Sequence, residues 1–188
     1  MKSERMTIQD IAGFCPEEAI WKMMADVSAF LLNDDAVHML APASVIVDGN
    51  MFFTCGDAKV APEYLAPEQD HDTDGKELQL VWQIGALAYL MATGHVVFGG
   101  HGGRYQREHP HVSLPVLPKN LSLLTPVIQR CLCYEPVKRV GMKELNAMAT
   151  KGLAACSRQQ RVKAEQPSGK ALLRNSEGDK WPEEMIEI

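Results

Sequence analysis

Four histidines within seventeen residues form the densest group of potential metal ligands in the sequence: His95, His101, His109 and His111. Zinc sites need three or four converging ligands, usually with cysteine among them, and no Cys-x-x-Cys pair accompanies these histidines. A polar surface loop is therefore the favoured interpretation. If a metal were bound, His109 and His111 would be the best pair. We expect neither a metal nor any other cofactor.

Residues 99–103 read Gly-Gly-His-Gly-Gly, which invites comparison with a phosphate-binding loop. A Walker loop needs Gly-Lys-Ser/Thr at the start of a helix that follows a strand, and no lysine comes here. The dinucleotide-binding pattern also fails, because Tyr105 stands where its third glycine should be. The run therefore predicts a flexible loop.

The five cysteines are odd in number and scattered: Cys15, Cys55, Cys131, Cys133 and Cys156. A secreted disulfide scaffold would be shorter and denser in cysteine, so we expect reduced, structural thiols. The first ten residues carry charge but no apolar stretch of the kind found in a signal peptide. Both observations predict a cytoplasmic protein.

Hydrophobic periodicity predicts a mainly α-helical domain with one small β-hairpin. A helix should begin at Pro16, because proline suits the first helical position and two acidic residues follow it. Gly94 should end a later helix as its C-terminal cap. The expected helices cover about 16–32, 76–93, 121–134 and 142–155, the hairpin joins 44–47 to 51–54, residues 6–14 form a short helical turn, and 55–75 and 95–120 are irregular.

The helix expected over 76–93 is apolar on almost every side, which is typical of a central helix covered by others. The apolar window over 81–100 is long enough to raise a transmembrane interpretation. Gln83, Thr93 and His95 interrupt it, and Gly94 would end a helix inside it. A buried core helix is therefore favoured over a membrane span.

The composition limits the class of protein. The chain has 188 residues, is 46% hydrophobic and 23% charged, and carries a formal net charge of −5. These values fit one globular domain with a tail, and the negative charge argues against a nucleic-acid partner. Residues 151–174 contain six basic residues and one acid, whereas 175–188 contain one base and five acids. We therefore expect a domain over 6–150 and a charged, mobile tail over 151–188.

Four segments resemble, in the right order, sequence motifs of protein kinases. Ala66-Pro-Glu68 resembles the Ala-Pro-Glu motif that closes the kinase activation segment. Residues 81–94 resemble the kinase F helix, and Phe98 stands where kinases have Pro-Phe after that helix. Residues 130–139, with a Cys-Leu pair, Pro136 and a closing arginine, resemble the Cys-Leu…Asp-Pro-x-x-Arg signature.

Residues 37–47 in turn resemble the kinase catalytic loop. The alignment is anchored on Leu40, Pro42, Val45 and Val47. It places Met39 at the position of the catalytic aspartate, Ala41 at that of the lysine and Ser44 at that of the metal-binding asparagine. After the hairpin, Thr54 stands at the position of the aspartate in Asp-Phe-Gly. The resemblance covers about residues 6–149. It implies the helical C-lobe of a kinase without its N-lobe, because a complete kinase needs about 250 residues.

These departures predict that the chain is not an enzyme and does not bind ATP. Phosphoryl transfer needs an aspartate at the hydroxyl group and acidic or amide ligands for the metal. Met39 accepts no proton, and the neutral hydroxyls of Ser44 and Thr54 are poor ligands for a hard cation. The chain also resembles the non-catalytic kinase C-lobe domain of Spire-type actin nucleators in residues 7–11 and 16–21. That resemblance implies a pseudokinase-like scaffold for a basic or amphipathic peptide.

The resemblance also implies structural roles. Glu68 should form a buried ion pair with Arg139, and Trp82 should lie in the central helix. The aspartate that begins the kinase F helix and braces the catalytic loop is replaced by Leu80, which suggests a loop that no longer needs alignment.

Loss of an N-lobe would uncover the face near residues 39–54 and the loop at 70–75, so we expect the partner there. Acidic residues favour a basic partner. The candidate residues are Asp34, Asp35, Met39, Asp70, Asp72 and Asp74. Three alternatives stay open: the tail, with its basic segment or with Trp181 and Met185, could cover this face; a divergent kinase could be completed by a separate N-lobe; or the chain could be a decayed fragment without function.

Overall fold

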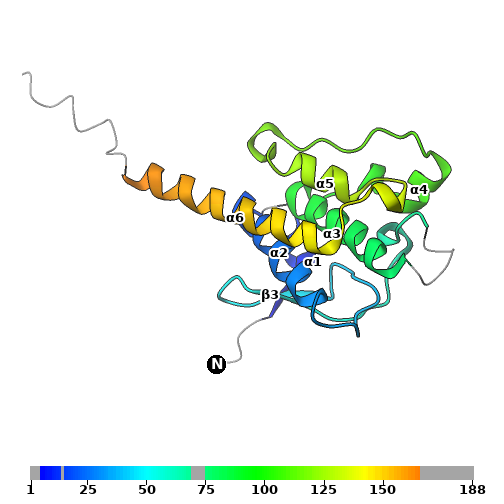
Figure 1. Ribbon diagram of the computed structural model, residues 1–188, viewed down its shortest axis with the longest axis horizontal. Helices are drawn as coiled ribbons and strands as arrows, with labels where there is room; N and C mark the ends of the chain where they lie inside the picture. Colours follow the sequence, from blue (N-terminus) through cyan, green and yellow to red (C-terminus); the bar gives the residue numbers. More distant parts are fainter. Residues whose placement is uncertain (1–4, 14, 69–74, 166–188) are drawn as a thin grey trace, which may run out of the picture.

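The computed structural model describes residues 5–13, 15–68 and 75–165. It is mainly helical with a small antiparallel sheet, as the sequence predicts (Figure 1). Its α-helices are α1 (Ile8–Ile11), α2 (Glu17–Leu31), α3 (Lys76–Thr93), α4 (Gly102–Glu108), α5 (Thr125–Cys131) and α6 (Met142–Glu165). Short 3-10 helices are η1 (Pro62–Tyr64), η3 (Phe98–Gly100), η4 (Lys119–Leu121) and η5 (Pro136–Lys138).

The sheet has three strands, β1 (Met6–Thr7), β2 (Val45–Val47) and β3 (Phe53–Cys55), in the order β1-β2-β3. The predicted hairpin is present, with Ile46 opposite Thr54. Its turn is held by Asp48, whose carboxylate accepts the backbone N–H groups of Asn50 and Phe52 at 2.8 and 2.9 Å. The helical turn expected over 6–14 is confined to α1, because residues 6 and 7 pair with β2 instead.

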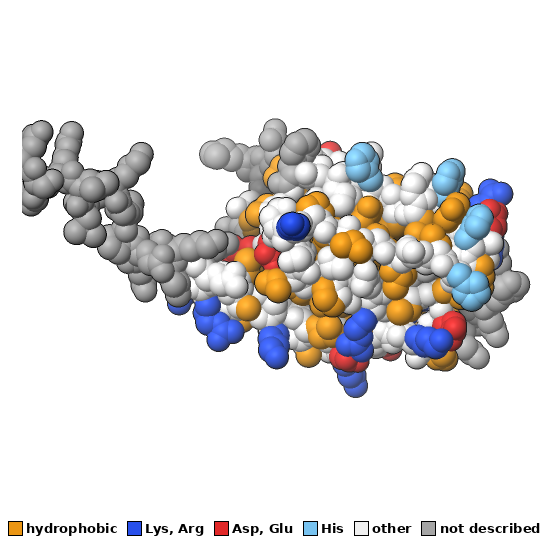
Figure 2. Space-filling model, turned by 90° about the horizontal axis from the view of Figure 1, so that it is seen from above, with side chains coloured by type: hydrophobic (Ala, Val, Ile, Leu, Met, Phe, Trp, Pro, Cys, Tyr) orange, Lys and Arg blue, Asp and Glu red, His pale blue; other side chains and the backbone are white. Residues whose placement is uncertain are grey.

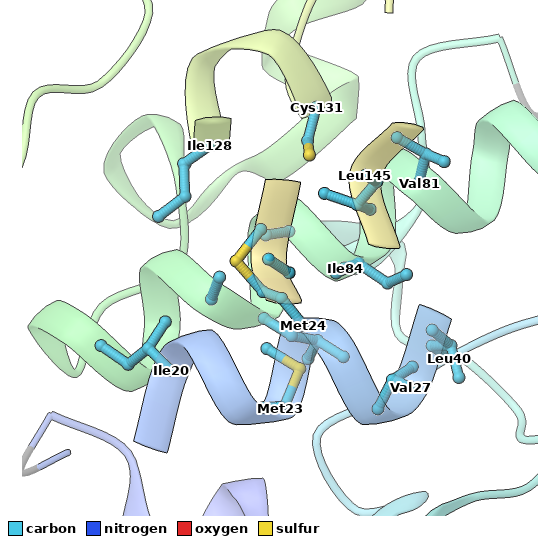
Figure 3. Close-up of a cluster of buried hydrophobic side chains, with 14 of the residues drawn as sticks. Ile20, Met23, Met24, Val27, Leu40, Val81, Ile84, Ile128, Cys131 and Leu145 are labelled. Atoms are coloured by element: carbon cyan, nitrogen blue, oxygen red, sulfur yellow. The ribbon is translucent and has the colours of Figure 1, made fainter. Parts of the chain in front are cut away.

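Helix α3 lies at the centre of the fold, and its bounds match the prediction. It ends at Gly94, whose φ of 75° is the left-handed conformation that suits glycine at a C-cap. Side chains of α3 meet those of α2, α5 and α6 in one hydrophobic core (Figure 3). Within the described part of the chain, no helix has the length and apolar character needed to cross a membrane.

Helix α4 corrects the prediction of an irregular segment over 95–120. Its first two glycines lie directly against the backbone of the segment around η1: a Cβ at Gly102 would collide with the Glu63 carbonyl, and one at Gly103 with the Leu65 carbonyl. The glycines that suggested a flexible loop therefore allow close packing of a helix. This reason is tertiary and leaves no periodic signal in the sequence.

Helix α6 extends ten residues beyond the predicted end at 155, so the tail expected from 151 begins inside a helix. Residues of α6 beyond 150 also pack against α2. A Cβ at Gly152 would approach the Trp21 ring to 2.6 Å, and the Ser157 hydroxyl donates to the Glu18 carboxylate at 3.3 Å. The helix predicted over 121–134 is shorter, since only η4 and α5 are helical there. Trp181, Met185 and the rest of 166–188 lie outside the described residues.

Candidate functional site

The loop over 37–44, which resembles the kinase catalytic loop, is held in place by Asp57. One carboxylate oxygen of Asp57 accepts the backbone N–H groups of His38 and Met39 at 2.9 and 3.0 Å. These two hydrogen bonds lower the pKa of Asp57, because they stabilise its charged form. Asp57 comes directly after the hairpin, so it ties the loop to the sheet.

Gln83 supplies a second brace from the central helix. Its side-chain oxygen accepts the N–H of Leu40 at 2.9 Å, and its amide nitrogen donates to the carbonyl of Tyr64 at 3.2 Å. Gln83 is 1% exposed, so both of its polar ends are satisfied inside the core. The loop is therefore held by Asp57 and Gln83, although Leu80 stands at the position compared with the bracing aspartate of kinases. Asp57 and Gln83 were missed as site residues, although a glutamine within an apolar helix was a signal.

The three positions aligned with kinase catalytic groups differ in their surroundings. Met39 is half-buried on the braced loop. The Ser44 hydroxyl accepts the N–H of Ala41 and donates to the carbonyl of the same residue, both at 3.0 Å. Thr54 is exposed on β3. Ser44 therefore uses its hydroxyl to close the loop.

The Glu68–Arg139 ion pair predicted from the resemblance is present. Arg139 donates through both terminal nitrogens to the Glu68 carboxylate, at 2.7 Å for Nη2 and Oε2. Its side chain is fully buried and also donates to three backbone carbonyls, those of Leu78, Cys133 and Tyr134. A guanidinium with this many acceptors is fully satisfied in the interior. The pair therefore fixes the segment after η1 against η5.

Trp82 lies in the core, as expected. It is 0% exposed, and its indole N–H donates to Gln106 of α4 at 3.0 Å. The Gln106 amide in turn donates to the carbonyl of Leu132 at 2.6 Å. This chain of hydrogen bonds joins α3, α4 and the end of α5.

Two of the predicted partner-binding residues share a cavity. A pocket of about 180 Å³ opens beside the end of α2 and the start of α3. We call it the acidic cavity. Its lining residues are Leu31, Leu32, Asp34, Asp35, Val37, Lys76, Glu77, Leu80 and Met142. Three acidic residues and one lysine thus surround an apolar floor.

Several polar groups of the acidic cavity already make hydrogen bonds with the backbone. Asp34 accepts the N–H of Ala36 at 2.8 Å, and Glu77 accepts the N–H of Met142 at 2.8 Å, which fixes the start of α6. Lys76 donates to the backbone carbonyl of Asp35, so the Asp35 carboxylate is not the acceptor of that bond. Met39 does not line this cavity. Asp70, Asp72 and Asp74 lie outside the described residues.

Cys55, which follows the Thr54 position, is buried. Burial, with a smaller contribution from the Asp34 charge, raises the pKa of its thiol to about 12. The thiol is therefore protonated at neutral pH and a poor nucleophile.

The histidines gather at the end of the molecule that carries α4 (Figure 2). His101, Tyr105 and His109 stack along that helix, with ring centroids 6.0 Å apart for the first pair and 4.2 Å for the second. Tyr105 thus separates the two imidazoles. Among the described residues, no group of three or more histidine, cysteine or acidic side chains is placed to hold a metal ion.

Comparison of the sequence with protein-family models found no match, and a search of curated proteins found none either. The kinase interpretation therefore depends on the motifs and on the contacts that their residues make.

Proposed function

We propose that this chain is a catalytically inactive, kinase-C-lobe-like interaction module that binds a basic or amphipathic peptide. The observation that carries the proposal is the braced 37–44 loop. Asp57 and Gln83 fix its backbone, whereas Met39, Ser44 and Thr54 replace the groups that phosphoryl transfer requires. A loop that keeps a fixed shape without those groups is suited to presenting a surface.

The acidic cavity beside this loop is the binding site in this proposal. Its apolar base can pack against the stem of a lysine or arginine side chain, while the carboxylates at its rim face the charged end. Asp34 and Asp35 contribute two negative charges there, and Asp35 is exposed. The partner is thus a peptide with a cationic side chain flanked by apolar residues.

Peptide binding can be measured by fluorescence anisotropy. The probe is a labelled peptide in which arginine alternates with leucine, and a peptide with glutamate in place of arginine is its control. The double variant Asp34→Asn/Asp35→Asn should weaken binding about fivefold, since it removes two charge contacts at the surface. The matched double variant Glu108→Gln/Glu135→Gln changes two exposed acids elsewhere and should leave the affinity unchanged. Equal binding by both double variants would contradict the proposed site.

Nucleotide binding separates this proposal from a divergent kinase. A ligand that binds only the folded state raises the unfolding temperature with its concentration. Titration with Mg-ATP to millimolar concentration should therefore leave the melting temperature unchanged. Clear stabilisation would refute the inactive module and favour a nucleotide-binding protein.

A further inference from the structure

A second cavity, of about 350 Å³, lies between the N-terminal part of α2, the start of α5 and the middle of α6. It shares no residue with the acidic cavity. We call it the α6 groove. Trp21, which is 4% exposed, lies at its base, and Leu123, which is 59% exposed, lies at its rim. Its volume is within the range of clefts that bind ligands, about 300–1,000 Å³.

The surroundings of the α6 groove favour an acidic occupant. Between Glu144 and Glu165 the sequence of α6 contains no acidic residue and four basic ones. Lys151 lines the groove, and Arg158 is exposed further along the same helix. Glu17 of α2 also lines the groove, where its carboxylate accepts the indole N–H of Trp21 at 3.1 Å. The field of the α6 face therefore attracts a negatively charged segment.

The sequence that follows α6 has the matching composition. Residues 175–188 contain five acids and one base. Their large apolar residues are Trp181, Met185, Ile186 and Ile188, and three of these (Trp181, Met185 and Ile188) stand at positions i, i+4 and i+7, the spacing of one helix face. We propose that this segment, in the same chain, docks in the α6 groove with its apolar side chains against Trp21 and Leu123.

The length of the connection allows this docking. The groove residue Gly152 is about 20 Å from the end of α6 at Glu165, given the helical rise. Residues 166–180 can span up to about 50 Å when extended, so the segment can return to the groove. The negative charge of residues 175–188 also argues against docking in the acidic cavity, because Asp34 and Asp35 would repel that segment. The α6 groove thus lies beside a helix rich in basic residues, whereas three acids line the proposed peptide site.

Acrylamide quenching of Trp181 tests the docking in the full chain. The signal of Trp181 is obtained as the difference between the parent and Trp181→Phe. In the parent, Trp181 should be shielded from acrylamide. Leu123→Glu places a charge at the groove rim and should remove the shielding, so that quenching rises to the level of the chain unfolded in urea. Val137→Glu is the matched control, because Val137 is 87% exposed and does not line the groove.

A second variant is needed because Leu123→Glu could release Trp181 simply by unfolding the protein. Glu183→Lys/Glu184→Lys leaves the residues of the described fold unchanged and should also release Trp181, with unchanged far-ultraviolet circular dichroism. The proposal is overturned if Trp181 in the parent is already as accessible as in urea, or if both variants leave it shielded. It is also overturned if shielding appears only with rising concentration and a doubled mass, since the occupant is then a second copy.

Discussion

At the scale of single residues, the Glu68–Arg139 pair is the most demanding electrostatic feature. Arg139 is buried, so loss of its carboxylate partner leaves a charge in the interior with only backbone carbonyls as acceptors. Removing one partner of a buried pair costs about 3–5 kcal/mol. Glu68→Ala should lower the free energy of unfolding by about 3 kcal/mol, near the lower end because three carbonyl acceptors remain. Urea denaturation at neutral pH measures it.

The exposed pair of Arg104 and Glu108 provides the comparison. Glu108→Ala removes the same charge from the surface and should change the free energy of unfolding by less than about 0.5 kcal/mol. Equal effects of the two substitutions would show that the buried pair contributes no more than a surface contact.

Asp57 gives a second prediction at this scale, for the dependence of stability on pH. The hydrogen bonds from His38 and Met39 lower its pKa in the folded state, below the unfolded value of about 3.9. They therefore stabilise the fold above about pH 4, and that stabilisation is lost as the pH falls through the folded pKa. Asp57→Asn should be less stable than the parent at pH 7, and the difference should shrink below about pH 4.

Urea denaturation at pH 7, 5 and 3 measures this difference. Glu108→Gln is the control, because Glu108 accepts no backbone N–H of the 37–44 loop. A gap between the parent and Asp57→Asn that stays constant from pH 7 to pH 3 would show that the Asp57 charge does not hold this loop.

At the scale of elements, the contact between α3 and α5 depends on a missing side chain. A Cβ at Gly85 would lie 2.5 Å from the Cβ of Cys131 and 3.4 Å from the Leu132 side chain. Alanine favours a helix over glycine by about 1 kcal/mol. Overpacking of a tight core costs about 1–3 kcal/mol, and the obstacle here is the first atom of a buried side chain. Gly85→Ala should therefore destabilise the protein by about 1–2 kcal/mol.

Thermal and urea unfolding of Gly85→Ala check this sign. Gly49 is the matched position, since nothing lies within 4 Å of a Cβ built there. Gly49→Ala should leave the free energy of unfolding nearly unchanged. A stabilised Gly85→Ala would mean that helix propensity outweighs packing at this contact.

The elements also show what the sequence can predict. The bounds of α3 follow from an apolar run and a glycine cap, and α2 follows from Pro16 and the acids after it, because these signals are local. Helix α4 was missed because its glycines serve a contact with η1 that the local sequence does not record. The braces of the 37–44 loop were missed for the same reason. Gln83 lies 43 residues from Leu40, whose backbone N–H it accepts, and Asp57 lies 19 residues from His38, whose N–H it accepts.

At the scale of the whole molecule, one core joins elements from α1 to α6. The buried side chains of this core range from Ile8 to Ala149 along the chain, and they come from the sheet as well as the helices. Exposed large apolar side chains are scattered among β1, the hairpin turn, the end of α2 and the segments around η4 and η5. Scattered residues of this kind are normal on a single domain. The described fold is thus closed around its own core.

A domain with one closed core should unfold in a single step without a separate N-lobe. Urea transitions followed by far-ultraviolet circular dichroism and by tryptophan fluorescence should coincide, because Trp21 in α2 and Trp82 in α3 report the same core. The dye ANS should not bind at neutral pH, since bound ANS marks exposed apolar surface. Separate transitions, or strong ANS fluorescence before urea is added, would instead indicate half of a domain whose core another chain must complete.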